Sequence, residues 1–226
     1  MRILVTAGGT REYIDPVRFI SNASSGRMGY ALARAALRAG HEVTLITAPT
    51  ALTPPAGAKV IRVETAAQMF QAVKEQFPKC DCLIMAAAVS DYTPAKPSKT
   101  KLKKQVARLV LELKPTPDIL KWAGRHKTKS RATGRGPQIV VGFALEDRDL
   151  RANAERKLRE KHLDMIVANA PTSIGGDTST LHIRTPRGDW LEIRDMKKAA
   201  SASRIIGIIG AACKSTINNH PSSISP

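Results

Sequence analysis

The sequence begins MRILVTAGGTREYIDPVRFISNASSGRMG (residues 1–29), an apolar run that leads into glycines and then into a helical pattern. We expect a strand over Arg2–Thr6 and a helix over Gly26–Ala39, with Gly40 as the stop signal of that helix. Free backbone N–H groups and the dipole at such a helix start attract anions. The stretch from Gly8 to Gly29 therefore predicts a phosphate-handling loop in an α/β protein.

Strand and helix patterns continue to alternate along the chain, which predicts a Rossmann-like, doubly wound and mostly parallel sheet. The other expected strands are Val43–Thr47, Val60–Val63, Cys82–Ala86, Leu109–Leu113, Ile139–Phe143 and Met165–Ala168. The other expected helices are Ala66–Phe77, Pro117–Gly124, Leu150–Lys161 and Lys197–Ile217. The segments Ser179–Arg184 and Trp190–Ile193 predict a late β-hairpin.

The chain has 226 residues, 42% of them hydrophobic, which suits one globular domain with a sizeable core. We expect residues 1–218 to form that domain and residues 219–226 to form a disordered tail. No apolar run approaches the length of a membrane span, and the N-terminus enters a strand without a signal peptide. Cys80, Cys82 and Cys213 show no framework spacing, which fits a reducing compartment. We therefore expect a cytoplasmic protein without membrane contact.

The formal net charge is +17, and it is placed unevenly, with 19 Lys and Arg against seven Asp and Glu between residues 96 and 161. Such a region attracts polyanions, either nucleic acid or a nucleoside triphosphate with a phosphorylated co-substrate. Only 4% of residues are aromatic and no nucleic-acid reader motif is present, so specific nucleic-acid binding is not expected.

Two details argue against the main alternative, an NAD(P)-binding Rossmann oxidoreductase. The loop between the first strand and the first helix is much longer than the tight turn of a dinucleotide fingerprint. The second strand ends in Ala48-Pro49-Thr50, where such a fold usually places an acidic residue for the ribose, and Glu42 lies at the wrong end.

The long loop carries residues suited to chemistry. Ser24 or Ser25 is expected to cap the helix, while Arg18 offers a charged fork for a phosphate or carboxylate. Asn22 combines a donor amide with an acceptor oxygen, which suits a tetrahedral or acyl-phosphate oxygen. Taken alone, Asn22 could equally form a local turn, and a lysine run at 101–104 could be a solvated surface.

Five motifs in order together resemble the bacterial phosphopantothenoylcysteine synthetase family over roughly residues 2–210. They are GGTREYIDPVRFISNASSGRMG at 8–29, AAAVSDYTP at 86–94, K-x-K-K at 101–104, LKPTPDIL at 113–120 and VGFALED at 141–147. The run from Ala154 to Asn169 resembles the family's late basic helix and strand. The chain departs from the family's common residues at Arg27 and at Leu145-Glu146-Asp147.

The resemblance implies a ligase in coenzyme A biosynthesis that uses CTP and Mg²⁺ but no flavin. It would join 4′-phosphopantothenate to cysteine through an acyl-cytidylate, releasing pyrophosphate and then CMP. The resemblance also implies a homodimer, formed through the segment after the lid and the late hairpin.

By the same resemblance, Asn22, Arg18 and Lys101 would be catalytic, and Asp91 is the candidate metal ligand. The stretch Ser90–Ala107 is basic and contains prolines, and it would be a mobile lid that brings lysines to the site. The residues expected to bind the nucleotide and its phosphates are Gly8, Gly9, Thr10, Ser24, Ser25, Gly26, Ala87, Ala88, Asp91, Lys101, Lys104, Phe143, Lys157 and Lys161.

Overall fold

An eight-stranded sheet forms the centre of the computed structural model, which describes residues 1–104, 109–128, 137–173 and 176–218. Its parallel strands, in spatial order, are β10 (Met165–Asn169), β9 (Ile139–Leu145), β6 (Cys82–Met85), β1 (Arg2–Ala7), β4 (Glu42–Thr47) and β5 (Lys59–Arg62). Strand β11 (Thr178–Arg184) runs antiparallel beside β10, and β12 (Leu191–Lys197) completes the hairpin at the edge. The predicted parallel sheet with a late hairpin is confirmed.

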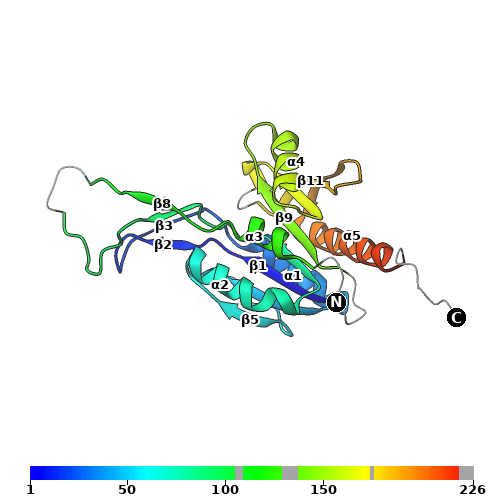
Figure 1. Cartoon of the computed structure of the whole chain (residues 1–226), viewed down its shortest axis with the longest axis horizontal. Helices are drawn as coiled ribbons and strands as arrows, with labels where there is room; N and C mark the ends of the chain where they lie inside the picture. Colours follow the sequence, from blue (N-terminus) through cyan, green and yellow to red (C-terminus); the bar gives the residue numbers. More distant parts are fainter. Residues whose placement is uncertain (105–108, 129–136, 174–175, 219–226) are drawn as a thin grey trace.

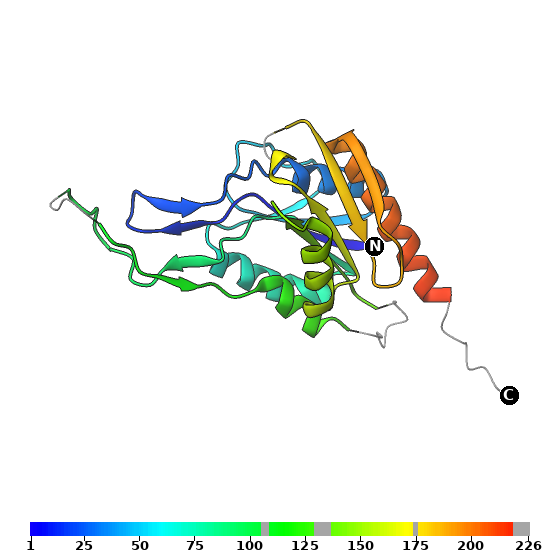
Figure 2. The same cartoon turned by 90° about the horizontal axis from the view of Figure 1, so that it is seen from above.

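Helices cover both faces of this sheet (Figure 1, Figure 2). Helices α1 (Arg27–Arg38) and α5 (Lys198–Asn218) share one apolar core with the sheet, and α2 (Ala66–Gln76), α3 (Ile119–His126) and α4 (Leu150–Glu160) share the other. Strand β1 serves both cores because successive side chains of a strand point to opposite faces. Ile3 and Val5 pack towards α1, while Leu4 packs towards α2. Two 3₁₀ turns, η1 (Phe77–Lys79) and η2 (Pro171–Ser173), complete the described elements.

The order of the strands reverses between β1 and β6. From β1 the chain moves outwards through β4 to β5, then returns to β6 and continues in the opposite direction to β9 and β10. In sheets of this kind the loops on the two sides of the reversal separate, and a crevice opens at the carboxyl ends of the strands. The fold therefore places a binding site beside the loops that follow β1 and β6.

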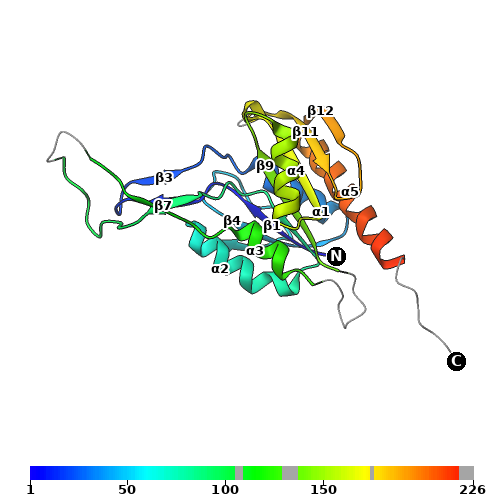
Figure 3. The same cartoon turned by 45° about the horizontal axis from the view of Figure 1, so that its top comes forward.

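An arm projects from the carboxyl end of the sheet, as Figure 1 and Figure 3 show. One ribbon is the hairpin of β2 (Arg11–Tyr13) and β3 (Phe19–Ser21), and the other pairs β7 (Tyr92–Pro94) with β8 (Leu113–Pro115). The expected loop from Arg11 to Asn22 is thus largely a hairpin. The predicted lid, Ser90–Ala107, supplies β7, and its residues 105–107 lie outside the described residues.

Two local expectations need correction. The predicted strand Leu109–Leu113 is shifted, because the ladder that pairs with Tyr92–Pro94 begins at Leu113 and ends at Pro115. Helix α1 begins at Arg27, and its N-cap is Gly26 with φ 75°, so neither Ser24 nor Ser25 occupies the N-cap position. The Ser25 hydroxyl still accepts from the Arg27 N–H, at the long distance of 3.5 Å. A glycine occupies the N-cap position because a left-handed backbone costs little only without a Cβ atom. In the part of the chain that the structure describes, no helix could cross a membrane.

Helix α1 lies unusually close to β1 at Gly29. A Cβ atom built on Gly29 would lie 2.6 Å from the Cβ atom of Ala7 and 2.9 Å from the carbonyl oxygen of Thr6. These distances are far below van der Waals contact, so the absence of a side chain at Gly29 sets the position of the helix start relative to the sheet.

We expect Gly29→Ala to destabilise the protein by about 1–3 kcal/mol, because the added methyl group forces α1 away from β1. Gly207→Ala is a matched control in α5, since its Cβ atom would meet nothing within 4 Å. This control should gain roughly 0.5–1 kcal/mol from the helix preference of alanine. Urea unfolding of both variants measures the difference, and an unchanged stability of Gly29→Ala would contradict the close approach.

Candidate active site

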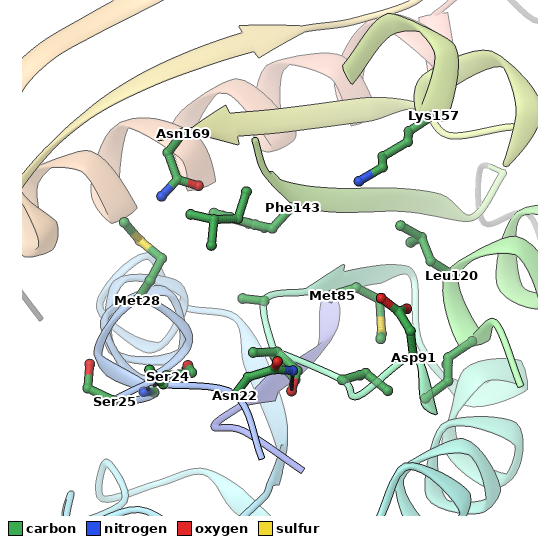
Figure 4. A pocket seen from close by; sticks show the side chains of 18 of the residues that line it. Asn22, Ser24, Ser25, Met28, Met85, Asp91, Leu120, Phe143, Lys157 and Asn169 are labelled. Atoms are coloured by element: carbon green, nitrogen blue, oxygen red, sulfur yellow. Dashed lines mark hydrogen bonds between the residues drawn. The ribbon is translucent and has the colours of Figure 1, made fainter. Parts of the chain in front are cut away.

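A cavity of about 560 Å³ lies at the carboxyl ends of β6, β9 and β10, beside the start of α1 (Figure 4). Ten of the residues predicted to bind substrate or nucleotide line its wall: Asn22, Ser24, Ser25, Gly26, Ala87, Ala88, Asp91, Phe143, Lys157 and Lys161. Their roles stay predictions, but the structure brings these residues, which lie far apart in the sequence, to one place.

The loops after β1 and β6 hold each other and form the floor of the cavity. The backbone N–H of Ala88 donates to the carbonyl of Gly8 at 2.8 Å, and that of Thr10 donates to the carbonyl of Ala88 at 3.2 Å. The hydroxyl of Thr10 accepts from the N–H of Ser90 at 2.9 Å, and that of Thr6 accepts from the N–H of Ala87 at 3.1 Å. These bonds continue the parallel pairing of β1 and β6 into the loops that follow the two strands.

Gly8, Gly9 and Thr10 therefore lie behind the cavity wall rather than in it, which differs from the expected direct contact with phosphate. Thr10 is fully buried, and a Cβ atom on Gly9 would lie 2.9 Å from the carbonyl oxygen of Asn22. The small size of these residues allows the loop that carries Asn22 to pack closely on the end of β1. Gly8, Gly9 and Thr10 therefore position that loop from behind the cavity wall.

Asn22 projects from this floor into the cavity (Figure 4). Its side-chain amide donates to the carbonyl of Ala88 at 3.1 Å. This bond joins the loop after β1 to the loop after β6 and fixes the orientation of the Asn22 side chain. An amide group carries two N–H donors and an acceptor oxygen. The bond to Ala88 uses one donor, so a second N–H remains to bind an oxygen of a reacting group.

The rim opposite α1 carries two lysines that are held by carboxylates. The Lys157 ammonium lies 2.5 Å from the Glu146 carboxylate, and the Lys161 ammonium lies 2.9 Å from that of Asp118. Both lysines line the cavity, so they do not lie on a purely solvated face of the helix. An anionic ligand would compete with the two carboxylates for these cations.

Asp91 and Asp118 both line the cavity on this side. Among the described residues no group of three or more His, Cys, Asp or Glu side chains could hold a metal ion. Mg²⁺ commonly uses only one or two carboxylates together with phosphate oxygens and water. The donor set here fits a Mg²⁺ that arrives with a phosphate ligand, and it does not form a cage made of protein alone.

Arg18, Lys101 and Lys104 lie on the arm and do not line the cavity of their own chain. The guanidinium of Arg18 binds the Asp15 carboxylate at 2.5 and 2.9 Å and donates to the carbonyl of Leu102 at 2.8 Å. Asp15 also accepts from the Leu102 N–H at 3.1 Å. In this chain Arg18 thus connects the two ribbons of the arm, instead of lying beside Asn22 as expected.

Asn169, the last residue of the motif that begins at Ala154, also lines the cavity, but the sequence did not indicate the wall contributed by Ser179 and Lys198. The topology explains their position. Strand β11 runs antiparallel to β10, so it begins at the carboxyl edge of the sheet, where Ser179 lies. Strand β12 returns the chain to that edge just before Lys198. The predicted late hairpin was the available signal for Ser179 and Lys198.

The glycine turn itself is closed to the pyrophosphate of a dinucleotide. The Thr50 side chain fills the space above the glycine turn, since Cβ atoms on Gly8 and Gly26 would lie 3.1 and 2.8 Å from its Cγ2 atom. The Thr50 hydroxyl accepts from the Leu52 N–H at 3.0 Å, which fixes the loop after β4. A pyrophosphate running from α1 towards β4 would meet this loop, so the geometry disfavours the NAD(P) alternative.

Comparisons with known proteins identify the family to which the chain belongs. The family described as "DNA/pantothenate metabolism flavoprotein C-terminal domain" matches residues 1–212. The coenzyme A biosynthesis bifunctional protein CoaBC of Bacillus subtilis is 42% identical over 219 residues, which are 95% of this chain and 52% of that protein. This chain thus spans about half the length of the curated relatives it matches.

Two solved structures share the fold. The crystal structure of the C-terminal domain of a CoaBC protein has a TM-score of 0.79 at 39% identity, covering 95% of this chain and 96% of that one. The DNA/pantothenate metabolism flavoprotein from Streptococcus pneumoniae has a TM-score of 0.78 at 27% identity, covering 94% and 99%.

The contacts of the Asp15 carboxylate predict that the stability of the folded protein decreases at acid pH. The Arg18 guanidinium, together with backbone N–H donors, holds the pKa of Asp15 well below its usual range. A lowered pKa in the folded state gives stability that is present above the unfolded value of about 4 and is lost as the pH falls further. We expect Asp15→Asn to be less stable at neutral pH and to lose less stability than the wild type below about pH 4.

Denaturant unfolding between neutral and acid pH measures this difference. Asp189→Asn is the control, because the Asp189 side chain is fully exposed and lies 4.0 Å from its nearest cation, Arg184. Equal acid sensitivity of the wild type and Asp15→Asn would show that the carboxylate does not stabilise the fold.

Proposed function

Because the chain belongs to the DNA/pantothenate metabolism flavoprotein C-terminal domain family, we propose that it is a ligase joining 4′-phosphopantothenate to cysteine in coenzyme A biosynthesis. CTP is the proposed activating nucleotide, and no flavin takes part. The observation that carries the proposal is the position of Asn22, whose amide enters a cavity between the start of α1 and two lysines, Lys157 on α4 and Lys161 at its C-cap.

The proposed reaction has two steps. A carboxylate oxygen of 4′-phosphopantothenate attacks the α-phosphorus of CTP, forming the acyl-cytidylate and releasing pyrophosphate. The amine of cysteine then attacks the acyl carbon, loses a proton and expels CMP, which leaves the amide product. Both steps shift negative charge onto phosphate oxygens, and the second also places it on the former carbonyl oxygen.

Asn22 is the proposed donor to that carbonyl oxygen. Preorganised donors are most effective when they point to the place where charge develops. The bond to the carbonyl of Ala88 holds the Asn22 amide before substrate arrives, so little reorganisation is needed. The same bond fixes which face of the amide is presented to the reacting group.

The nucleotide phosphates are proposed to bind at the first turn of α1, where Ser24, Ser25 and Gly26 line the cavity. Lys157 and Lys161 would leave Glu146 and Asp118 to neutralise charge on the opposite rim. Ala87, Ala88 and Phe143 would line the space beside the nucleotide. Asp91 would hold Mg²⁺, which would supply positive charge beside the phosphates.

We place the enzyme in the cytoplasm. Cys80, Cys82 and Cys213 form no disulfide, and the first two are buried, as suits a reducing compartment.

Asn22→Asp should lower formation of the amide product by about 100-fold, because a carboxylate cannot donate to the acyl oxygen and repels the adjacent phosphate. Purified protein with Mg²⁺, 4′-phosphopantothenate, cysteine and each nucleoside triphosphate in turn should release pyrophosphate and CMP with CTP. Asn153→Asp is the control, since Asn153 lies on α4 and donates to the Arg148 carbonyl outside the cavity. No product with any nucleotide would refute the function, and full activity of Asn22→Asp would refute its role.

A homodimer formed through the arm is the second part of the proposal. The segment after the lid exposes apolar side chains, with Leu109 57%, Val110 75% and Leu113 42% exposed, and Val17 and Phe19 of the hairpin in the same arm are exposed as well. Several large exposed apolar side chains on one projecting part of a protein commonly mark an interface. The late hairpin gives less support, because Arg194 and Asp195 of its edge strand are exposed.

In such a dimer Lys101 and Lys104 would act on the cavity of the second copy, because the arm carries them away from their own (Figure 1). Lys101→Gln and Asn22→Asp should each be inactive alone. A co-expressed mixture should regain about a quarter of wild-type activity, because half of random dimers contain one intact composite site. Absence of recovery in a mixture that sedimentation shows to be dimeric would place the lysine in its own chain's site.

A further inference from the structure

A buried hydroxyl without a partner stands in the cavity wall. Ser179 is 5% exposed, and its Oγ atom has no hydrogen-bond partner in the structure. Ser179 and Leu181 lie on the same face of β11, and both line the cavity. A buried hydroxyl that makes no hydrogen bond is costly, so such a group calls for an explanation.

The surroundings of Ser179 are cationic and rich in donors. Arg27, at the start of α1, and Lys198, at the start of α5, line the same end of the cavity. The Arg27 guanidinium lies 2.8 Å from the Asp177 carboxylate, two residues before Ser179, and the Lys198 ammonium donates to the Gly176 carbonyl. The N-cap residue of helix α1, Gly26, has no side chain, and the Ser25 hydroxyl accepts from the Arg27 N–H at 3.5 Å, so later N–H groups of the first turn remain for a ligand at this end.

This end lies opposite the Asp91 and Lys157 side of the cavity. In Figure 4, Ser24, Ser25, Met28 and Asn169 gather on one side, and Asp91, Leu120 and Lys157 gather on the other. The first turn of α1 and the N-terminal end of β11 therefore lie together at one end of the cavity, away from Asp91 and Lys157.

We propose that Ser179, Lys198 and the first turn of α1 form a subsite for a terminal phosphate group, with Arg27 at its edge. The inference deepens the proposed function and rests on it for the identity of the ligands. A phosphate carries several oxygens and two negative charges, so it can accept from Ser179, from Lys198 and from backbone N–H groups at once. Ser179 then gains the partner that it lacks in the free protein.

The electrostatics of Lys198 fit this assignment. Burial, followed by the nearby Arg27 guanidinium, lowers the pKa of Lys198. A bound phosphate would offset both effects, because it supplies an opposite charge between the two cations. The nearest carboxylate, that of Asp177, is engaged with Arg27 and leaves the cluster with a net positive charge.

Two ligands of the proposed reaction carry a terminal phosphate. One is the triphosphate tail of CTP, which leaves as pyrophosphate, and the other is the phosphomonoester of 4′-phosphopantothenate. Paired ligands separate these sources, because CMP lacks the tail and pantothenate lacks the phosphomonoester. Equilibrium binding by calorimetry without cysteine measures all four, so the result does not depend on turnover.

Ser179→Ala should weaken binding of one phosphate-bearing ligand by about tenfold, the size expected for a hydrogen bond to a charged group. The stability of the free protein should stay the same or rise, because the variant removes a buried unpaired hydroxyl. A purely structural serine would give the opposite pattern, with lower stability and equal losses for all four ligands, and that pattern would overturn the proposal.

Lys198→Met should weaken the same ligand by a larger factor, while Lys197→Met, at the exposed neighbouring position outside the cavity, should have no effect. A loss for CTP but not for CMP or 4′-phosphopantothenate assigns the subsite to the triphosphate tail. A loss for 4′-phosphopantothenate but not for pantothenate or CTP assigns it to the phosphomonoester. Unchanged affinity of Ser179→Ala for both phosphate-bearing ligands would overturn the subsite, even if Lys198→Met failed to fold.

The outcomes remain separate from those of the proposed function. A protein that binds these phosphates through Ser179 but makes no amide product would keep the subsite and lose the ligase. A protein that makes the product, with Ser179→Ala binding normally, would keep the ligase and lose the subsite.

Discussion

The pairing of the loops after β1 and β6 is the constraint on which the rest of the site depends. These strands are neighbours at the reversal of strand order, where the connecting helices leave to opposite faces of the sheet. Without further bonds the two loops would separate. The hydroxyls of Thr6 and Thr10 and the backbone bonds between Gly8 and Ala88 keep them together and give Asn22 a rigid carbonyl to bind.

This constraint also decides which half of the fold binds ligands. The loop after β4 packs Thr50 onto Gly8 and Gly26, where a dinucleotide would cross from one half to the other. In dinucleotide-binding folds the glycines of this turn allow a pyrophosphate to approach the backbone. In this protein Gly8 and Gly26 allow the Thr50 side chain to approach instead. The cavity that holds Asn22 therefore extends towards β9, β10 and the hairpin, which bring in Phe143, Asn169 and Ser179.

The sequence correctly predicted those parts of the structure in which a local pattern of residues is compatible with one kind of element. Continuous apolar strands alternating with helices predict a parallel sheet, and the residues around Asn22, Ala87 and Lys157 fell into one cavity. The arm was missed because its ribbons are short and its turn depends on Asp15, which accepts from the backbone of Val17 and Arg18. The Asp15-Pro16 pair between two short strand patterns was the available signal of a turn. Arg18 could not be placed from sequence, because its partner Leu102 is 84 residues away.

The free protein keeps several of its charges and donors partly engaged by groups that a ligand could replace. Lys157 and Lys161 are held by carboxylates, Arg27 by Asp177 and Lys198 by a backbone carbonyl. Such partners limit the repulsion among cations that would otherwise destabilise the empty cavity, and each ion pair at this level of exposure is weak enough to be exchanged. Ser179 is different, because a neutral hydroxyl needs no counterion and its missing partner costs stability in the free state. The proposed phosphate subsite thus differs from a structural ion-pair network in one respect: the Ser179 hydroxyl has no partner until a ligand arrives.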